Sequence, residues 1–388
     1  MNSNENDMNK TSGKKNRRSF IKNTSAITGA IITGGLANSC MKSENKNNAD
    51  TPADFNIITN KKFNWRCVTT WPPNFPVLGE AVVKMAEELK VITNGQLNIK
   101  VYGGGELVPS LEVFDAVTQG AAQMGHGASY YWAGKMPSSV FFCTIPFGMN
   151  AQQINSWMLH GDGWKLWKEL YAQVNLLPFP CGNTGVQMGG WFNKEINTIQ
   201  DLQGLKMRIP GLGGKVISKA GTAAVTIAAG ELYTNLERGV IDATEWIGPY
   251  HDYLMGFHKV AKYYYYPGWH EPGSCMELFI NKSAFEELPK NIQLIVENTA
   301  LKYNLWVLSE FEAKNNFYLQ KILNESDAQL KKFPDEVLFT LKDYAGEVID
   351  EITSKDAFAK KVFENFSKFK KEIVSWNDTS EQAIIPYL

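Results

Sequence analysis

Cysteine and histidine are scarce in this sequence, and neither forms the pattern of a metal or redox site. Each occurs five times among 388 residues. There is no His-x-His or His-Glu-x-x-His arrangement, and the cysteine spacings match no zinc or redox motif. We expect four cysteines in apolar or tightly turned stretches to be buried free thiols, although an exported protein could also join two of them in a disulfide. These four are Cys67, Cys143, Cys181 and Cys275.

An excess of charge of either sign is also missing. The formal net charge is −1, and acidic and basic residues are interspersed along the chain. A nucleic-acid-binding protein would instead carry a clustered basic face. We therefore expect no nucleic-acid partner.

The sequence contains no assembled catalytic motif. A Gly-x-Ser-x-Gly nucleophile elbow is absent. The glycine-rich stretch at 211–215 lacks the spacing of a phosphate-binding loop, and the three glycines at 103–105 do not continue as a dinucleotide fingerprint. Both stretches are interpreted as turns. We therefore expect a protein that is not an enzyme and that holds no organic cofactor.

The first 40 residues have the features of an export signal. A basic stretch contains the pair Arg17-Arg18, which is typical of a twin-arginine signal. The weakly apolar run at 26–37 is too short to span a bilayer permanently but suits the apolar part of a signal. It leads to a relaxed lipobox ending at Cys40, which predicts a lipid anchor there; the alternative is ordinary peptidase cleavage near Ala37. Residues 41–62 are polar and predict a flexible tether. Because the signal directs export, we expect the protein to be located in the periplasm.

After this leader the chain alternates between strand and helix patterns. Residues 63–70 alternate as a strand, residues 78–93 have helical spacing, and residues 97–102 form the next strand. A helix at 111–117 and a strand leading to the aromatic loop at 130–132 complete a β-α-β-α-β series, which is typical of a mostly parallel sheet. Because ligands of such sheets lie outside the carboxyl ends of the strands, this aromatic loop is well placed for binding.

The order of these segments predicts an α/β protein with two discontinuous lobes and a helical C-terminus. Residues 63–147 together with about 245–285 are predicted to form the first lobe, and residues 148–244 with later crossing segments the second. Between Pro289 and Pro334 no proline or glycine interrupts the helical spacing, so a helix there would be roughly 50 Å long at 1.5 Å per residue. Residues 286–388 are therefore predicted to be a helix spanning both lobes, followed by further helices.

Three polar residues form the strongest candidate site. Arg208 follows a short strand, and its two-pronged guanidinium matches a carboxylate, although a surface arginine in an ion pair would give the same pattern. Glu245 also ends a strand and would repel an anion held by Arg208 unless a cation lay between them. Sodium or calcium prefers carboxylate, amide and carbonyl oxygens, and Gln187 could supply the amide oxygen.

Longer motifs surround these residues. They read Gly-Val-Gln-Met-Gly-Gly-Trp-Phe-Asn-Lys at 185–194, Met-Arg-Ile-Pro-Gly at 207–211 and Ile-Asp-Ala-Thr-Glu-Trp at 241–246. They resemble the solute-binding subunits of tripartite ATP-independent periplasmic (TRAP) transporters, the DctP family. The segments at 108–132 and 263–273 resemble in particular the branch that binds 2-oxo acids such as pyruvate, or lactate, together with a metal ion.

The resemblance extends from residue 63 to the C-terminus and implies a two-lobed fold like that of class II periplasmic binding proteins. By position, Arg208 would clamp the substrate carboxylate. Gln187, Glu245 and the backbone carbonyl of Trp246 would hold sodium or calcium, and Gln187 and Trp246 would also contact the substrate.

Three further residues are implied at the pocket. Glu271 and Tyr131 would be additional members, and Phe192 would form a wall. The resemblance also implies a small organic carboxylate as ligand, the small and large TRAP membrane subunits as partners, and a homodimer through the C-terminal helices.

Two alternatives to a pyruvate receptor remain at this point. The first is the same receptor with lactate or another 2-hydroxy acid as ligand. The second is an oxidoreductase, because the twin-arginine route often carries proteins folded around cofactors. Visible absorbance from a cofactor in the purified protein would favour the oxidoreductase.

Overall fold

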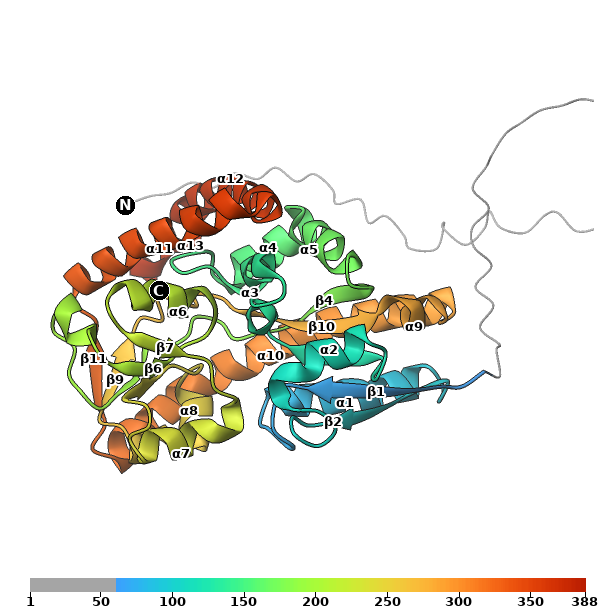
Figure 1. The fold of residues 1–388 in the computed structure, drawn as a ribbon, viewed down its shortest axis with the longest axis horizontal. Helices are drawn as coiled ribbons and strands as arrows, with labels where there is room; N and C mark the ends of the chain where they lie inside the picture. The colour runs from blue at the N-terminus through green and yellow to red at the C-terminus, as the bar shows by residue number, and fades with distance from the viewer. Residues whose placement is uncertain (1–60) are drawn as a thin grey trace, which may run out of the picture. The chain divides into compact units, whose positions relative to one another are not determined.

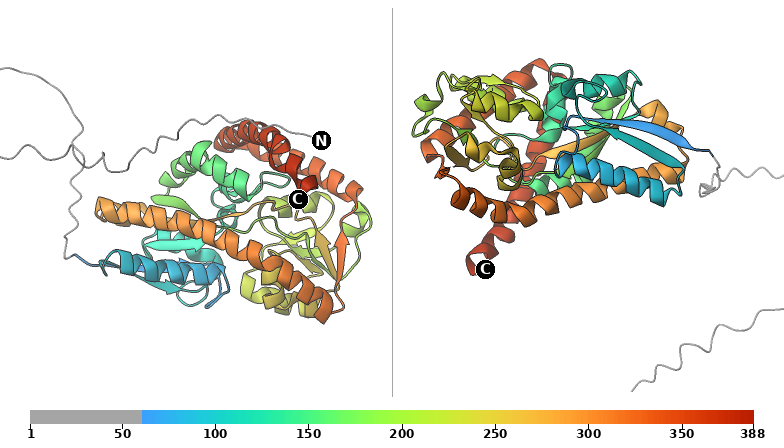
Figure 2. Two further views of the ribbon diagram at one scale, coloured as in Figure 1. Left: turned by 180° about the vertical axis from the view of Figure 1, so that it is seen from behind. Right: turned by 90° about the horizontal axis from the view of Figure 1, so that it is seen from below.

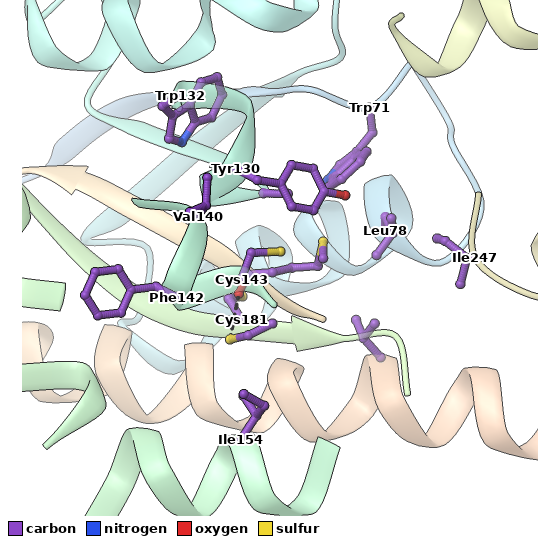
Figure 3. Close-up of a cluster of buried hydrophobic side chains, with 14 of the residues drawn as sticks. Trp71, Leu78, Tyr130, Trp132, Val140, Phe142, Cys143, Ile154, Cys181 and Ile247 are labelled. Carbon is purple, nitrogen blue, oxygen red and sulfur yellow. Dashed lines mark hydrogen bonds between the residues drawn. The ribbon is translucent and has the colours of Figure 1, made fainter. Parts of the chain in front are cut away.

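The computed structural model describes residues 61–388. The predicted signal, Cys40 and nearly all of the predicted tether lie outside the described residues. The four cysteines within them are free and buried, as expected. Figure 3 shows Cys143 and Cys181 among apolar side chains that include Tyr130, Phe142 and Ile154. Burial raises the pKa of both thiols, which keeps them protonated at neutral pH.

Two β-sheets organise the described residues (Figure 1). The first has the strand order β2-β1-β3-β10-β4, and the second has the order β11-β9-β5-β8-β6-β7. The strands of the first sheet are β1 (Phe63–Thr69), β2 (Leu97–Tyr102), β3 (Met124–Gly127), β4 (Leu176–Asn183) and β10 (Cys275–Asn281). Those of the second are β5 (Gly190–Phe192), β6 (Lys206–Arg208), β7 (Ala223–Val225), β8 (Ala243–Thr244), β9 (Tyr263–Tyr266) and β11 (Gln329–Lys332). Each sheet, with the helices packed on it, is called a lobe below.

Helices connect the strands and cover the sheets. Up to the last strand of the first sheet they are α1 (Leu78–Ile92), α2 (Val113–Thr118), α3 (Val140–Cys143), α4 (Ala151–His160), α5 (Gly163–Ala172), α6 (Gly211–Lys219), α7 (Leu232–Glu237) and α8 (Pro249–Met255). The later ones are α9 (Lys282–Glu286), α10 (Lys290–Glu325), α11 (Asp335–Lys355), α12 (Ala357–Thr379) and α13 (Glu381–Ile384). None of the helices in residues 61–388 has the length and apolar character that crossing a membrane requires.

Helix α1 illustrates how the sequence pattern determines an element. Leu78, Met85 and Leu89 recur at helical spacing, and all three are buried on the face that packs against β2 and α10. The helix ends before Asn94 and Gly95, whose φ angles of 50° and 73° leave the helical region. Such angles favour glycine and asparagine, so the chain turns there into β2.

Helix α10 spans both lobes, as the sequence predicts. It packs against β4 and α1 of the first lobe and against α8 of the second. Figure 2 shows it, in orange, running along one side of both sheets. Helices α11 and α12 provide another connection, because α11 packs on α6 of the second lobe and α12 on α3, α4 and α5 of the first.

Strand pairing divides the chain differently from the predicted lobe boundaries. The sequence predicts β4 in the second lobe, but β4 pairs with β10 in the first sheet. It predicts β9 in the first lobe, but β9 pairs with β5 and β11 in the second sheet. The chain therefore crosses between the lobes at residues 184–189 and 267–274. Local periodicity identifies these strands but carries no information about partners so distant in sequence.

Candidate functional site

The predicted site residues converge where the chain crosses between the lobes. Strands β6 and β8 are parallel neighbours, and Arg208 lies opposite Thr244 in their register. Their carboxyl ends therefore meet at one edge of the second sheet, which brings Arg208 beside Glu245. Gln187 lies on the crossing segment 184–189, and Glu271 lies on the segment 267–274.

The two crossing segments touch each other directly. The backbone N–H of Gln187 donates to the carbonyl of Glu271 at 3.1 Å, and that of Thr184 donates to Ser274 at 3.1 Å. A Cβ placed on Gly268 would lie 2.2 Å from the carbonyl oxygen of Gln187. Only glycine permits this approach, so the glycine in this aromatic segment is a condition for the site's geometry.

Arg208 uses both arms of its guanidinium within the protein. Nη1 donates to the Glu245 side chain in a close ion pair, and Nη2 donates to the hydroxyl of Tyr131 at 3.2 Å. Burial alone would lower the pKa of Arg208, but the Glu245 carboxylate raises it above its usual value. Tyr131 comes from the first lobe, so this cluster joins the two lobes.

Glu245 has a second partner on the other crossing segment. Its Oε2 lies 3.3 Å from Nε2 of His270. Ligand atoms of Glu245, His270 and Glu271 all lie within 4.8 Å of one another. Three buried residues of this kind can surround a cation, because two of them carry carboxylates.

Glu271 and Gln187 are joined by a hydrogen bond and complete the polar cluster. Glu271 accepts from Nε2 of Gln187 at 2.7 Å and from the hydroxyl of Ser274. Burial, together with the nearby charge of Glu245, raises the pKa of Glu271 to about 7. Burial therefore favours the protonated form of this carboxyl.

The amide oxygen of Gln187 has no hydrogen-bond partner among the described residues. Its nitrogen donates to Thr184 and Glu271, which assigns the orientation of the amide, and Oε1 is left buried and unpaired. A buried unpaired acceptor costs about 1–3 kcal/mol unless something binds it. A hard cation that takes oxygen ligands fits this requirement.

The conformation of the site is closed. Arg208, Glu245, Glu271 and Gln187 retain between 1% and 3% of their surface. In such a dry site electrostatic interactions are stronger than in water, and any unpaired charge is expensive.

Trp246 and Tyr131 border the cluster. The ring of Trp246 lies 5.0 Å from the guanidinium carbon of Arg208, within the range of a cation–π contact. Tyr131 follows β3 within a short 3-10 turn (Ser129–Trp132) and remains partly exposed.

The structure places Phe192 elsewhere. Its ring packs against Tyr265 at 5.3 Å and Phe333 at 6.0 Å, within the core of the second lobe. Neighbouring residues of a strand face opposite sides of the sheet, so motif position alone did not reveal this orientation. These contacts give no support to the prediction that Phe192 forms a pocket wall.

The sequence did not assign a role at the site to His270 or Ser274. His270 is one of five histidines that form no recognisable motif, and its Nδ1 has no hydrogen-bond partner among the described residues. The only signal for either residue was its place beside Glu271 in an aromatic, glycine-containing segment. A lone histidine or serine there is ordinarily structural.

The chain is similar in sequence to known solute-binding proteins. The family model of bacterial extracellular solute-binding proteins, family 7 (DctP), matches residues 67–356. A monocarboxylate 2-oxoacid-binding periplasmic protein of Nostoc sp. is 39% identical over 94% of this chain and 97% of its own length.

Solved structures of TRAP periplasmic solute-binding proteins share the fold. That of Pseudoalteromonas atlantica, with bound sodium and pyruvate, is 41% identical, has a TM-score of 0.82 and covers 84% of this chain and 100% of its own. That of Colwellia psychrerythraea, with calcium and pyruvate, is 40% identical with the same TM-score and coverage.

A third structure comes from Bordetella bronchiseptica. It is 36% identical, has a TM-score of 0.83 and covers 84% of this chain and 97% of its own; it is a mixed-occupancy dimer with calcium and picolinate in one site. The sequence resemblance and the expected α/β fold are thereby confirmed. The chain belongs to the DctP family of TRAP solute-binding proteins, the bacterial extracellular solute-binding proteins of family 7.

Proposed function

We propose that this protein is an extracytoplasmic receptor that captures a small 2-oxo monocarboxylate such as pyruvate, together with sodium or calcium, and delivers it to TRAP membrane subunits. The observation that carries the proposal is the buried group formed by the Arg208 guanidinium, the Glu245 carboxylate and the unpaired Gln187 oxygen. A guanidinium that can bind a carboxylate therefore lies beside oxygen atoms that can bind a cation. A substrate that binds the cation through its carboxylate and a neighbouring oxygen requires both.

In this proposal Arg208 binds the substrate carboxylate. Only a guanidinium offers two parallel donors to both carboxylate oxygens. In the closed structure Glu245 occupies this fork, so substrate binding exchanges one carboxylate for another. Tyr131, which accepts a hydrogen bond from Nη2 of Arg208, also borders the proposed substrate site. Glu271, which is hydrogen-bonded to Gln187, borders it as well.

The cation fits the donor set of this chain. Gln187 Oε1, the Glu245 carboxylate and the backbone carbonyl of Trp246 would hold it, and all three are oxygens. When bound, the cation supplies the positive charge that lets Glu245 and a substrate carboxylate occupy one dry site. Sodium and calcium each accompany pyruvate in the relatives described above.

The ligand class follows from chelation. Pyruvate and picolinate, found in the relatives, both carry a donor atom on the carbon next to the carboxylate. A 2-hydroxy acid such as lactate has the same arrangement and is the second candidate ligand. Family membership favours a receptor without a catalytic step over the exported oxidoreductase.

Titration calorimetry on chelator-treated protein tests this function. We expect pyruvate to bind with sodium or calcium present, and propionate, which lacks the 2-oxo oxygen, to bind at least roughly tenfold more weakly. The affinities of lactate and of longer 2-oxo acids, measured in the same way, establish which substrate is preferred. Equal affinity for propionate and pyruvate, or binding indifferent to cations, would contradict the proposal.

The cellular location of the protein is proposed from its sequence. The twin-arginine pair and the lipobox-like end at Cys40 support export to the periplasm with a lipid anchor. Mass spectrometry of the protein from membranes distinguishes a diacylated Cys40 from cleavage near Ala37.

A homodimer through the C-terminal helices is also proposed. Trp376, Ile384 and Ile385 are exposed at the end of the chain, where a partner could cover them. The Bordetella bronchiseptica relative is a dimer, which supports this assembly. Light scattering at several concentrations should give twice the mass of the chain.

A further inference from the structure

His251 lies where three separate segments of the fold meet. It is on α8 and has 0% of its surface exposed. Its ring packs edge-on against Phe75 at 4.7 Å and against Phe311 of α10 at 5.5 Å, and it stacks beside Trp246 at 6.0 Å. Phe75 precedes α1 in the first lobe, and Trp246 follows β8 in the second.

Both nitrogens of this imidazole are hydrogen-bonded. Trp246 Nε1 donates to His251 Nδ1 at 2.7 Å, and His251 Nε2 lies 2.8 Å from the carbonyl oxygen of Pro76. An indole N–H can only donate and a carbonyl can only accept, so Nδ1 is the acceptor and Nε2 carries the proton. The neutral ring is thus a directional bridge with one bond on each side.

The two bonds lead to different lobes. Pro76 lies between β1 and α1 of the first lobe, whereas Trp246 borders the binding cluster of the second. If the lobes separate at this point, the bond to Pro76 must break. If the bond to Trp246 is lost, the indole N–H beside Arg208 loses the acceptor that it has among the described residues.

We propose that His251 is a positioning residue that couples the binding site to lobe closure, by holding Trp246 with one nitrogen and the first lobe with the other. The inference rests on the proposed function in that the ligand is held by closure of these lobes. The two bonds act in series, so breaking either one uncouples Trp246 from Pro76. Ligand release from the closed state is the step that this bridge slows.

Two substitutions separate the bonds. In His251→Asn the amide oxygen replaces Nδ1 and keeps the acceptor for Trp246, but no donor reaches Pro76. In His251→Gln the amide nitrogen replaces Nε2 and keeps the donor to Pro76, but Trp246 loses its acceptor. His251→Phe removes both bonds and preserves the ring.

We expect all three variants to release pyruvate faster than the parent, by roughly three- to tenfold for the loss of one hydrogen bond. Because the bonds act in series, His251→Phe should accelerate release no more than either amide variant does. Stopped-flow tryptophan fluorescence with calcium present measures the release rate, and thermal unfolding of the same samples measures stability. A merely structural histidine would lower the melting temperature without changing the release rate.

His126 provides a matched control. It is equally buried, accepts from Trp71 Nε1 at 2.8 Å and lies 2.8 Å from the carbonyl of Cys181. Both partners belong to the first lobe, so these bonds do not cross between lobes. His126→Asn should lower the melting temperature and leave the release rate at the parental value.

A ligand-free measurement separates this inference from the proposed function. Small-angle X-ray scattering of His251→Asn without ligand should give a larger radius of gyration than the parent, because the open form gains population. If no 2-oxo acid binds the parent but this expansion occurs, the proposed function is wrong and the bridge stands. Parental release rates and scattering in both amide variants would overturn the bridge, as would faster release in His126→Asn equal to that in His251→Asn.

Discussion

Arg208 and Glu245 form an ion pair in which each side chain has only 1% of its surface exposed. Removing one partner of such a pair leaves an uncompensated buried charge, which costs about 3–5 kcal/mol. The pair therefore balances one buried positive charge with one buried negative charge. In the proposed function, Glu245 therefore competes with the substrate carboxylate for the guanidinium of Arg208.

The first prediction concerns the two parallel donors of the Arg208 guanidinium. Arg208→Lys keeps the positive charge but replaces two fixed parallel donors with a single ammonium. A hydrogen bond to a charged group contributes about 1.5–3 kcal/mol, so we expect pyruvate affinity to fall roughly 10- to 100-fold by calorimetry at saturating calcium. Arg238→Lys, at an exposed position, is the matched control and should bind as the parent does. Parental affinity in Arg208→Lys would show that the fork does not hold the carboxylate.

The second prediction concerns Glu245 as a ligand of the cation. Glu245→Gln removes the carboxylate from the proposed cation site and leaves Arg208 buried without its charge partner. We expect calcium to lose its effect on pyruvate affinity, and the melting temperature to fall because the free energy of unfolding decreases by a few kcal/mol, up to about 5. Calorimetry with calcium and with chelator, together with thermal unfolding, measures both effects. Glu237→Gln, which alters an exposed carboxylate, is the control, and its pyruvate affinity should still depend on calcium. If the pyruvate affinity of Glu245→Gln also depended on calcium, Glu245 would be excluded as a cation ligand.

Much of this site could be predicted because its chemistry is carried by residue type at strand ends. Arg208 ends β6 and Glu245 directly follows β8, and parallel neighbouring strands bring such residues together. The place of β4 in the first sheet was not predictable, because its pairing with β10 joins segments far apart in the chain. The bridge at His251 was equally hidden, since a buried histidine acquires its partners only when loops from both lobes pack around it.

The buried carboxyl of Glu277 provides a test of the pH dependence of stability. Glu277 lies on β10 and accepts hydrogen bonds from Trp132 Nε1 and, at 2.7 Å, from the hydroxyl of Tyr171. Burial raises its pKa from 4.5 to about 8, although both hydrogen bonds lower it.

The sign follows from the two pKa values. Between pH 4.5 and about 8 the unfolded chain has lost this proton while the folded protein retains it. Folding then requires proton uptake, so this group's contribution to stability is complete below pH 4.5 and decreases by up to about 1.4 kcal/mol per pH unit as pH rises. Above about pH 8 both states are ionised and the loss levels off.

Glu277→Gln removes this titration and preserves the shape of the side chain. Its amide oxygen can accept from Trp132, and its nitrogen can donate to the hydroxyl of Tyr171. We expect the melting temperature of the ligand-free variant to exceed that of the parent by a margin that widens from pH 5 to pH 8 and is constant above it. Melting curves recorded across this range measure the margin. A constant difference at every pH would mean that Glu277 ionises in the folded protein as readily as it does in the unfolded chain.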